Sequence, residues 1–109
     1  MSSQNRQKKL ANLVKELCAE FLGKESNNTS LISVTSCTVS PDGKRATVYI
    51  SVLPEKKEKT ALNFAKRKRG EFREYLKKNL RIKIIPFIDI EIDLGEKNRQ
   101  KIDELQRAK

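Results

Sequence analysis

The side chains with the clearest chemistry in this sequence are cationic, and most of them lie in one stretch. Four consecutive basic residues at 66–69 precede Gly70, and more lysines and arginines follow at helical spacing. If the chain bends only mildly at the glycine, one ridge would carry Lys66, Arg69, Arg73 and Lys77. The exposed N–H groups at the start of a new helix would suit a phosphate there. The stretch therefore predicts an anion-binding surface.

The net charge of the chain is concentrated in the same region. The 109 residues include 24 Lys and Arg against 14 Asp and Glu, a formal charge of +10 at pH 7. Residues 55–83 hold 12 basic and 4 acidic residues, whereas residues 84–109 hold 5 and 6. A solvated helix face that keeps the protein soluble is the competing interpretation. We favour nucleic acid, because acidic residues do not offset the ridge and because arginines stand among the lysines around a glycine.

The residues expected to contact nucleic acid fall into two groups. The main group is Lys66, Arg67, Lys68, Arg69, Gly70, Arg73, Lys77, Lys78, Arg81 and Lys83. A second rim consists of Arg6, Lys8, Lys9, Lys44 and Arg45. Base reading is expected to be weak, because no aromatic pair on neighbouring strands offers to stack single-stranded bases. Tyr49 is interpreted as a packing residue, so contacts to the backbone would supply most of the affinity.

Several other chemistries lack the residues that they need. The sequence has no histidine, which excludes imidazole acid–base chemistry and His-based metal sites. Asp89, Glu91 and Asp93 alternate along one strand without a companion base or metal ligand, so they are expected to keep an edge strand soluble. We predict no catalytic residue, metal, cofactor or small-molecule substrate. Cys18 and Cys37 lie in apolar stretches, which predicts reduced core thiols.

No segment marks the chain for a membrane or for export. No apolar run approaches the ~18 residues of a membrane span, and the polar N-terminus lacks the hydrophobic region of a secretory signal. Basic helices can meet an anionic membrane surface, but here their apolar faces are needed for the core. We therefore expect a cytoplasmic monomer.

The first half of the chain predicts a helix followed by a hairpin. Apolar residues repeat at helical spacing from Leu10 to Leu22, and Gly23 is expected to end that helix. Residues 31–39 and 44–53 are rich in β-branched side chains and flank a turn at 40–43, so they predict two antiparallel strands. In the second strand, one face is expected to be buried: Ala46, Val48, Ile50 and Val52.

The second half predicts two helices, a strand and a final helix. Apolar residues at 61–65 indicate one helix, and those at 72–80 indicate another that begins near Gly70. Residues 82–92 predict a strand with Pro86 in its middle, which requires an edge position or a bulge. A short polar helix is expected at 98–109. The sum is one α+β domain over 1–109, with its core at about 5–94 and a polar helix or tail at 95–109.

The order α-β-β-α-α-β, with a glycine where two helices meet, resembles a type II KH domain with a three-stranded sheet. Over about residues 5–106 the sequence is similar to the ribosome-binding factor A family. The similarity is carried by the hairpin at 32–53 and by LRIKIIP at 80–86, and less specifically by the basic N-terminal helix. KH domains that bind single strands usually have Gly-x-x-Gly between these helices, whereas this chain has only one glycine, Gly70, at that place. At this junction the family's pattern resembles an Ala-x-Gly bend, and in this chain Lys68 stands at the position of the alanine.

The resemblance implies a non-catalytic assembly factor that binds the small (30S) ribosomal subunit and assists late maturation of 16S rRNA, including processing of its 5′ end. Its basic face would dock on an rRNA junction, stabilise one arrangement of helices, and leave when the subunit matures. The alternative is a general KH-like RNA-binding protein that acts on mRNA or small RNA. The missing Gly-x-x-Gly argues against that alternative.

Overall fold

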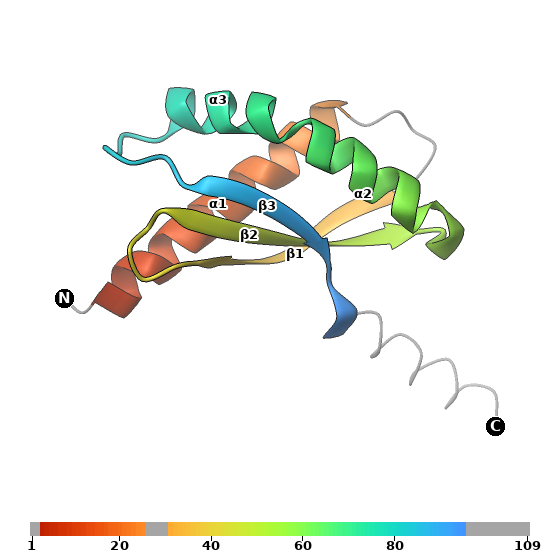
Figure 1. Cartoon of the computed structure of the whole chain (residues 1–109), viewed down its shortest axis with the longest axis horizontal. Coiled ribbons are helices and arrows are strands. Elements are labelled where there is room, and N and C mark those ends of the chain that lie inside the picture. The colour runs from red at the N-terminus through yellow and green to blue at the C-terminus, as the bar shows by residue number, and fades with distance from the viewer. Residues whose placement is uncertain (1–2, 26–30, 96–109) are drawn as a thin grey trace.

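A computed structural model describes residues 3–25 and 31–95 of the chain. Helix α1 (Ser3–Glu25) leads into strands β1 (Leu31–Val39) and β2 (Arg45–Leu53). A single 3-10 turn, η1 (Glu55–Lys57), precedes helices α2 (Glu58–Arg67) and α3 (Arg69–Asn79), and strand β3 (Phe87–Ile92) follows (Figure 1). This α-β-β-α-α-β order confirms the predicted α+β fold. The helix predicted at 98–109 lies outside the described residues.

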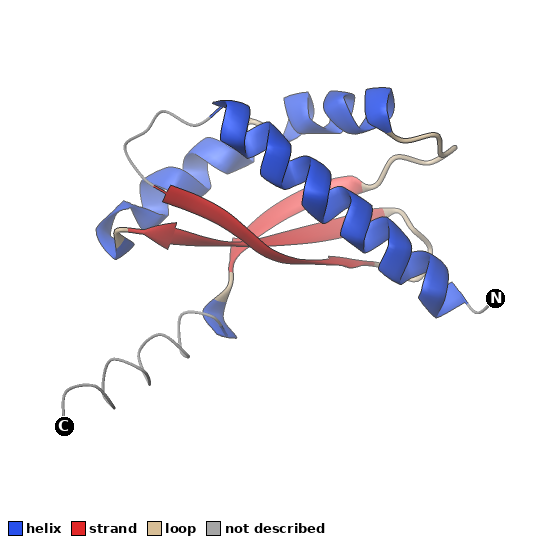
Figure 2. Ribbon diagram, turned by 180° about the vertical axis from the view of Figure 1, so that it is seen from behind, coloured by secondary structure: helices blue, strands red, loops and turns tan. Residues whose placement is uncertain are grey.

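The sheet has β2 at its centre. β1 pairs with it antiparallel and β3 pairs with it parallel, so β3 lies at an edge, and Pro86 falls just before it. The helices lie together on one side of the sheet (Figure 2). The predicted face of β2 is buried beneath them, because Ala46, Val48, Ile50 and Val52 are at most 5% exposed. On the opposite face of β2, Thr47, Tyr49 and Ser51 are half-buried.

The core joins this face to the apolar sides of the helices. Val14 and Cys18 of α1 and Leu76 of α3 are fully buried, and Ile88 and Ile90 extend the core along β3. Aromatic rings connect the two helices: the Phe21 ring lies 5.4 Å from Phe72 and 5.7 Å from Tyr75, measured between centroids. Burying each large apolar side chain contributes about 1.5–3 kcal/mol. The basic helices are therefore held to the sheet by their apolar sides.

Both cysteines are free thiols, as the sequence predicts. Cys18 is buried and Cys37 is partly buried against the same core. Burial raises the pKa of Cys18 to about 12, with a smaller contribution from the nearby Cys37, and raises the pKa of Cys37 to about 11. Neither thiol ionises near neutral pH.

Two predicted boundaries are wrong. The first helix starts at Ser3 instead of Leu10 and continues past Gly23 to Glu25. Gly23 keeps a negative backbone φ, so it does not act as a left-handed C-terminal cap. The last strand starts at Phe87 instead of Ile82, because Pro86 has no N–H to donate and the pairing with β2 begins only after it.

Candidate nucleic-acid interface

The two basic helices are separated by one residue, and that residue is Lys68. Its backbone angles, φ −88° and ψ 2°, leave the helical range. Its N–H is shared between the carbonyls of Phe64 and Ala65, while its own carbonyl accepts from the N–H of Phe72. Gly70, where we expected the bend, lies in the first turn of α3 with a negative φ, and a Cβ added there would meet nothing within 4 Å. The bend therefore belongs to Lys68 and not to Gly70.

Most of the predicted ridge does meet in one place. Lys66, Arg69 and Arg73 line a hollow between the helices and the edge of β3, which we call the helix hollow, together with Gly70, Phe87 and Ile88. Lys77 does not reach it and pairs with Glu74 at 3.3 Å. A second hollow, the α2 hollow, lies along the outer side of α2 and is lined by Thr60, Asn63, Lys66, Arg67 and Arg69. Lys66 and Arg69 are common to both.

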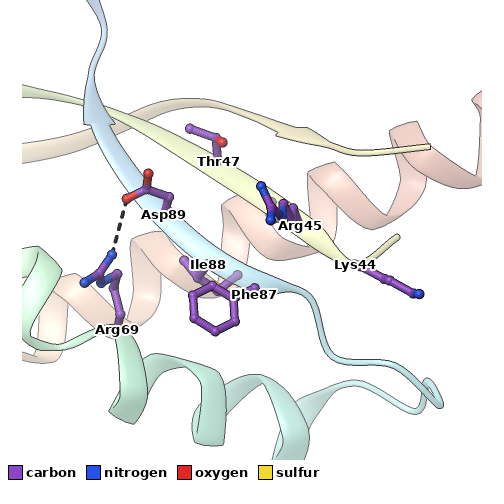
Figure 3. A pocket seen from close by; sticks show the side chains of 8 residues that line it. Lys44, Arg45, Thr47, Arg69, Phe87, Ile88 and Asp89 are labelled. Carbon is purple, nitrogen blue, oxygen red and sulfur yellow. Dashed lines mark hydrogen bonds and ion pairs between the residues drawn. The ribbon is translucent and has the colours of Figure 1, made fainter. Parts of the chain in front are cut away.

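Arg69 connects this surface to the sheet. Its Nε donates to the carbonyl of Lys66 at 2.9 Å, and its Nη1 lies 3.4 Å from the carboxylate of Asp89 on β3 (Figure 3). Beyond that pair lies a third hollow of about 500 Å³, the edge hollow, lined by Lys44, Arg45, Ala46, Thr47, Arg69, Phe87, Ile88 and Asp89. Arg69 thus lines all three hollows, and Asp89 is its partner instead of only a solubilising residue.

The β1–β2 turn positions the cations on the far wall of the edge hollow. Gly43 adopts φ 72°, and its N–H donates to the carbonyl of Ser40 at 2.9 Å. Asp42 accepts from the Ser40 hydroxyl at 2.6 Å and from the N–H of Lys44 at 3.0 Å, and these bonds lower the pKa of the Asp42 carboxyl. Lys44 and Arg45 therefore leave a fixed turn, which brings part of the predicted second rim beside the main group.

The rest of the predicted residues do not line these hollows. The connection from α3 to β3 exposes Arg81 and Lys83, and the last turns of α3 expose Lys78. Arg6, Lys8 and Lys9 are exposed near the start of α1. The start of α1, the β1–β2 turn and the α3–β3 connection all lie at one end of the molecule (Figure 1). That end collects cations from segments that are far apart in the sequence.

Acidic residues offset the ridge more than we expected from the sequence. Lys68 contacts Glu71 at 3.3 Å, and its ammonium lies 5.9 Å from the centre of the Phe64 ring. Together with the pairs made by Arg69 and Lys77, this means that three of the predicted contacts are engaged within the protein. Within residues 3–25 and 31–95, no carboxylate pairs with Lys66, Arg67, Lys78, Arg81 or Lys83. These cations are the ones most available to phosphates.

Arg73 has a structural task that the sequence did not show. Its Nη2 donates to the carbonyl of Ile85 at 3.2 Å, which attaches α3 to the segment that leads into β3. Its Nε is buried without a hydrogen-bond partner. Arg73 lies in the helix hollow, but its guanidinium is already directed into the protein.

Phe87 is the residue of this surface that sequence reasoning missed. We assigned it to the interior of a long apolar strand, yet its side chain is 68% exposed and lines both the helix and the edge hollow. The signal was present in the period of two: Phe87 alternates in phase with Asp89 and Glu91, and out of phase with the buried Ile88 and Ile90.

The described part of the chain offers no other obvious chemistry. It contains no group of three or more Cys, Asp or Glu side chains that could hold a metal ion. None of its helices is long and apolar enough to cross a membrane. The site presents arginines and lysines around three hollows, with Arg69 and Arg73 held by contacts within the protein, and this arrangement suits phosphate groups.

Known proteins with a similar sequence or fold point in one direction. Ribosome-binding factor A of Fervidobacterium nodosum is 38% identical over 70% of this chain, and the matched region spans 62% of the length of that relative. The crystal structure of ribosome-binding factor A from Thermus thermophilus superimposes with a TM-score of 0.69 at 22% identity, covering 77% of this chain and 92% of that one. A model of the Thermus protein fitted into a cryo-electron-microscopy map of a complex with the 30S subunit gives a TM-score of 0.64 at 22% identity, covering 72% and 86%.

Family-level comparison agrees with these individual matches. The model of the ribosome-binding factor A family matches residues 6–106. That span includes every element that lines the hollows and every cation assigned to them. The family is named for binding and not for a reaction, in line with the expectation that the chain is not an enzyme. The chain therefore belongs to the ribosome-binding factor A family.

Proposed function

We propose that this protein binds the small ribosomal subunit and assists late maturation of 16S rRNA without catalysing a reaction. Two facts support the first part: the chain belongs to the ribosome-binding factor A family, and a relative with the same fold has been fitted into a map of its complex with the 30S subunit. The cluster of Lys66, Arg67 and Arg69 supplies a surface on which rRNA phosphates can dock.

The single observation that carries this proposal is the convergence of cations on the three connected hollows. Lys44 and Arg45 come from the point where the β1–β2 turn enters β2, whereas Lys66 and Arg69 come from the α2–α3 segment. Arginines held by backbone bonds and ion pairs lose little freedom when they meet a phosphate. The mechanism is differential binding: the factor favours the rRNA arrangement that fits this surface and dissociates when the mature arrangement no longer does.

Charge reversal on α2 tests the docking surface. We expect Lys66→Glu with Arg67→Glu to weaken co-sedimentation with small subunits by about tenfold or more, because each lost charge-assisted contact is worth about 1.5–3 kcal/mol. Arg69 is left intact, since a glutamate there would face Asp89. The matched control is Lys56→Glu with Lys59→Glu, which makes the same change in net charge at exposed positions outside the hollows.

The result separates the proposal from a general effect of charge. Equal loss in both double variants, with unchanged thermal melts, would contradict a specific docking surface. Maturation is a separate readout: cells depleted of the protein should accumulate 16S rRNA with an unprocessed 5′ end, and wild-type protein should restore processing where the Lys66→Glu, Arg67→Glu variant does not. Binding to RNA oligonucleotides without any binding to small subunits would instead favour a general RNA-binding role.

A further inference from the structure

Phe87 is the most exposed large apolar side chain in the described part of the chain, at 68%. The residues on either side of it, Pro86 and Ile88, are buried, so the backbone there is fixed while the ring is not covered. Its N–H donates to the carbonyl of Lys44 at 2.7 Å, and it stands opposite Arg45 in the parallel pairing of β2 and β3. An aromatic ring is thus held at a rigid strand end and left in solvent.

The surroundings of the ring are cationic. Phe87 lines the edge hollow with Lys44 and Arg45, and it lines the helix hollow with Lys66 and Arg69. Figure 3 shows the ring at the edge of β3, with Arg69 reaching to Asp89 on one side and the Lys44–Arg45 segment beyond the strand. Asp89 is the one carboxylate that lines these hollows, and Arg69 already pairs with it.

We propose that Phe87 is a stacking platform for an unpaired RNA base, with Arg45 and Lys66 binding phosphates on either side of it. The inference rests on the proposed function and says which chemical part of the rRNA is bound at this point. A base offers a flat π face and is joined to phosphates on both sides, so one nucleotide segment can satisfy the ring and the cations together. Because every base has such a face, the contact selects for an unpaired nucleotide and not for a particular base.

The charges favour RNA over an apolar protein partner. A protein that covered Phe87 closely enough to bury it would also have to bury Arg45 and Lys44, and burying unpaired cations is costly. Single-stranded RNA leaves these side chains in contact with both phosphate and water. Removing an aromatic side chain on which one base stacks lowers the affinity by about fivefold or more, which is enough to measure.

The test uses the full chain and a single-stranded RNA of about ten nucleotides with 2-aminopurine near its middle, whose fluorescence falls when the base stacks. We expect the wild-type protein to quench the probe. Phe87→Ala should weaken binding by about fivefold or more and abolish the quenching, whereas Phe87→Trp should retain both. Phe87→Leu keeps an apolar side chain but no ring, so it should resemble Phe87→Ala.

The matched control is Leu31→Ala, which removes an apolar side chain of similar exposure, 62%. Leu31 pairs with Leu53 at the opposite end of β2 from Arg45, roughly 25 Å along the strand from Phe87. This variant should bind the probe as the wild type does, and thermal melts should agree for all variants because both side chains are exposed.

Four results would overturn the proposal: unchanged binding in Phe87→Ala, full binding in Phe87→Leu, equal loss in Leu31→Ala, or no quenching by the wild type at saturating probe. The failure of the proposed function looks different. If the wild type does not co-sediment with small subunits yet Phe87→Ala still loses the RNA probe, the ribosomal assignment fails and the stacking site stands. If subunit binding depends on Lys66 and Arg67 but Phe87→Ala binds and quenches the probe as the wild type does, the ribosomal assignment stands and the stacking site fails.

Discussion

Arg69 shows how one side chain can serve both the fold and the binding surface. Its guanidinium joins the carbonyl of Lys66 to the carboxylate of Asp89, and it also lines all three hollows. A phosphate that approaches Arg69 competes with Asp89 for the same hydrogen-bond donors. We infer that the affinity of this arginine for RNA is reduced by its internal partner, whereas that of Lys66 is not.

The sequence predicted which residue types would form the surface, but not which of them were already occupied. Net charge and helical spacing are enough to identify Lys66 and Arg67. They cannot show that Arg73 donates to Ile85 or that Lys68 meets Glu71 and Phe64, because those contacts depend on the angle between α3 and β3 and on the local break. The exposure of Phe87 is different, because its alternation with the buried Ile88 and Ile90 is visible in the sequence.

The role of Arg73 can be measured as stability. Arg73→Ala removes the hydrogen bond to the Ile85 carbonyl and the packing of the arginine stem, so we expect a loss of about 1–2 kcal/mol in the free energy of unfolding, measured by urea denaturation. Lys78→Ala on the same helix is the control and should stay within about 0.5 kcal/mol of the wild type. Equal stability of the two variants would show that the bond to Ile85 is unimportant.

At the scale of elements, α2 and α3 behave as one helix with a single defect. The bifurcated N–H of Lys68 keeps most of the helical hydrogen bonding, which explains why the ridge of Lys66, Arg69 and Arg73 survives the break. Hydrophobic periodicity revealed both helices and the hairpin. It could not reveal that β3 pairs parallel with β2, because pairing direction follows from the path of the helices that connect the strands.

A substitution at Gly70 separates its effects on folding and on binding. Gly70→Ala should raise the free energy of unfolding by about 0.5–1 kcal/mol, because the residue is helical with open space around its Cα. Since Gly70 lines the helix hollow, the added methyl group occupies space next to Lys66, and we expect weaker binding to small subunits. Urea denaturation and co-sedimentation give the two readouts. A destabilised variant would mean that the bend depends on the glycine after all.

For the whole molecule, the important fact is where the cations gather. Residues 55–83 account for most of the +10 charge, and folding places the cations of β2 and of the α2–α3 segment around the same edge of the sheet. A chain of this size can therefore present a directed field to an anionic partner. Composition alone gives the net charge, whereas only the fold shows on which side of the molecule the cations lie.

This distribution predicts a measurable response to salt. If about four phosphates are neutralised, the logarithm of the affinity for single-stranded RNA should fall with the logarithm of the salt concentration at a slope of about −3. Lys66→Ala should make that slope shallower by about 0.7, whereas Lys59→Ala, outside the hollows, should leave it unchanged. Fluorescence titrations of wild type and both variants at several salt concentrations provide the comparison. The same slope in all three proteins would exclude Lys66 as a phosphate contact.

The parallel pairing of β2 with β3 also affects the order in which parts of the protein fold. Arg45 and Phe87 face each other in the sheet although they are 42 positions apart in the chain, and all of α2 and α3 lies between them. Contacts of such long range form late in folding, because a large loop must close first. A chain in which β3 has not yet paired with β2 has no edge hollow, because Phe87, Ile88 and Asp89 of β3 form part of its lining. The protein thus gains this part of its RNA-binding surface only on completion of its own fold, and RNA that binds there in turn stabilises the folded state.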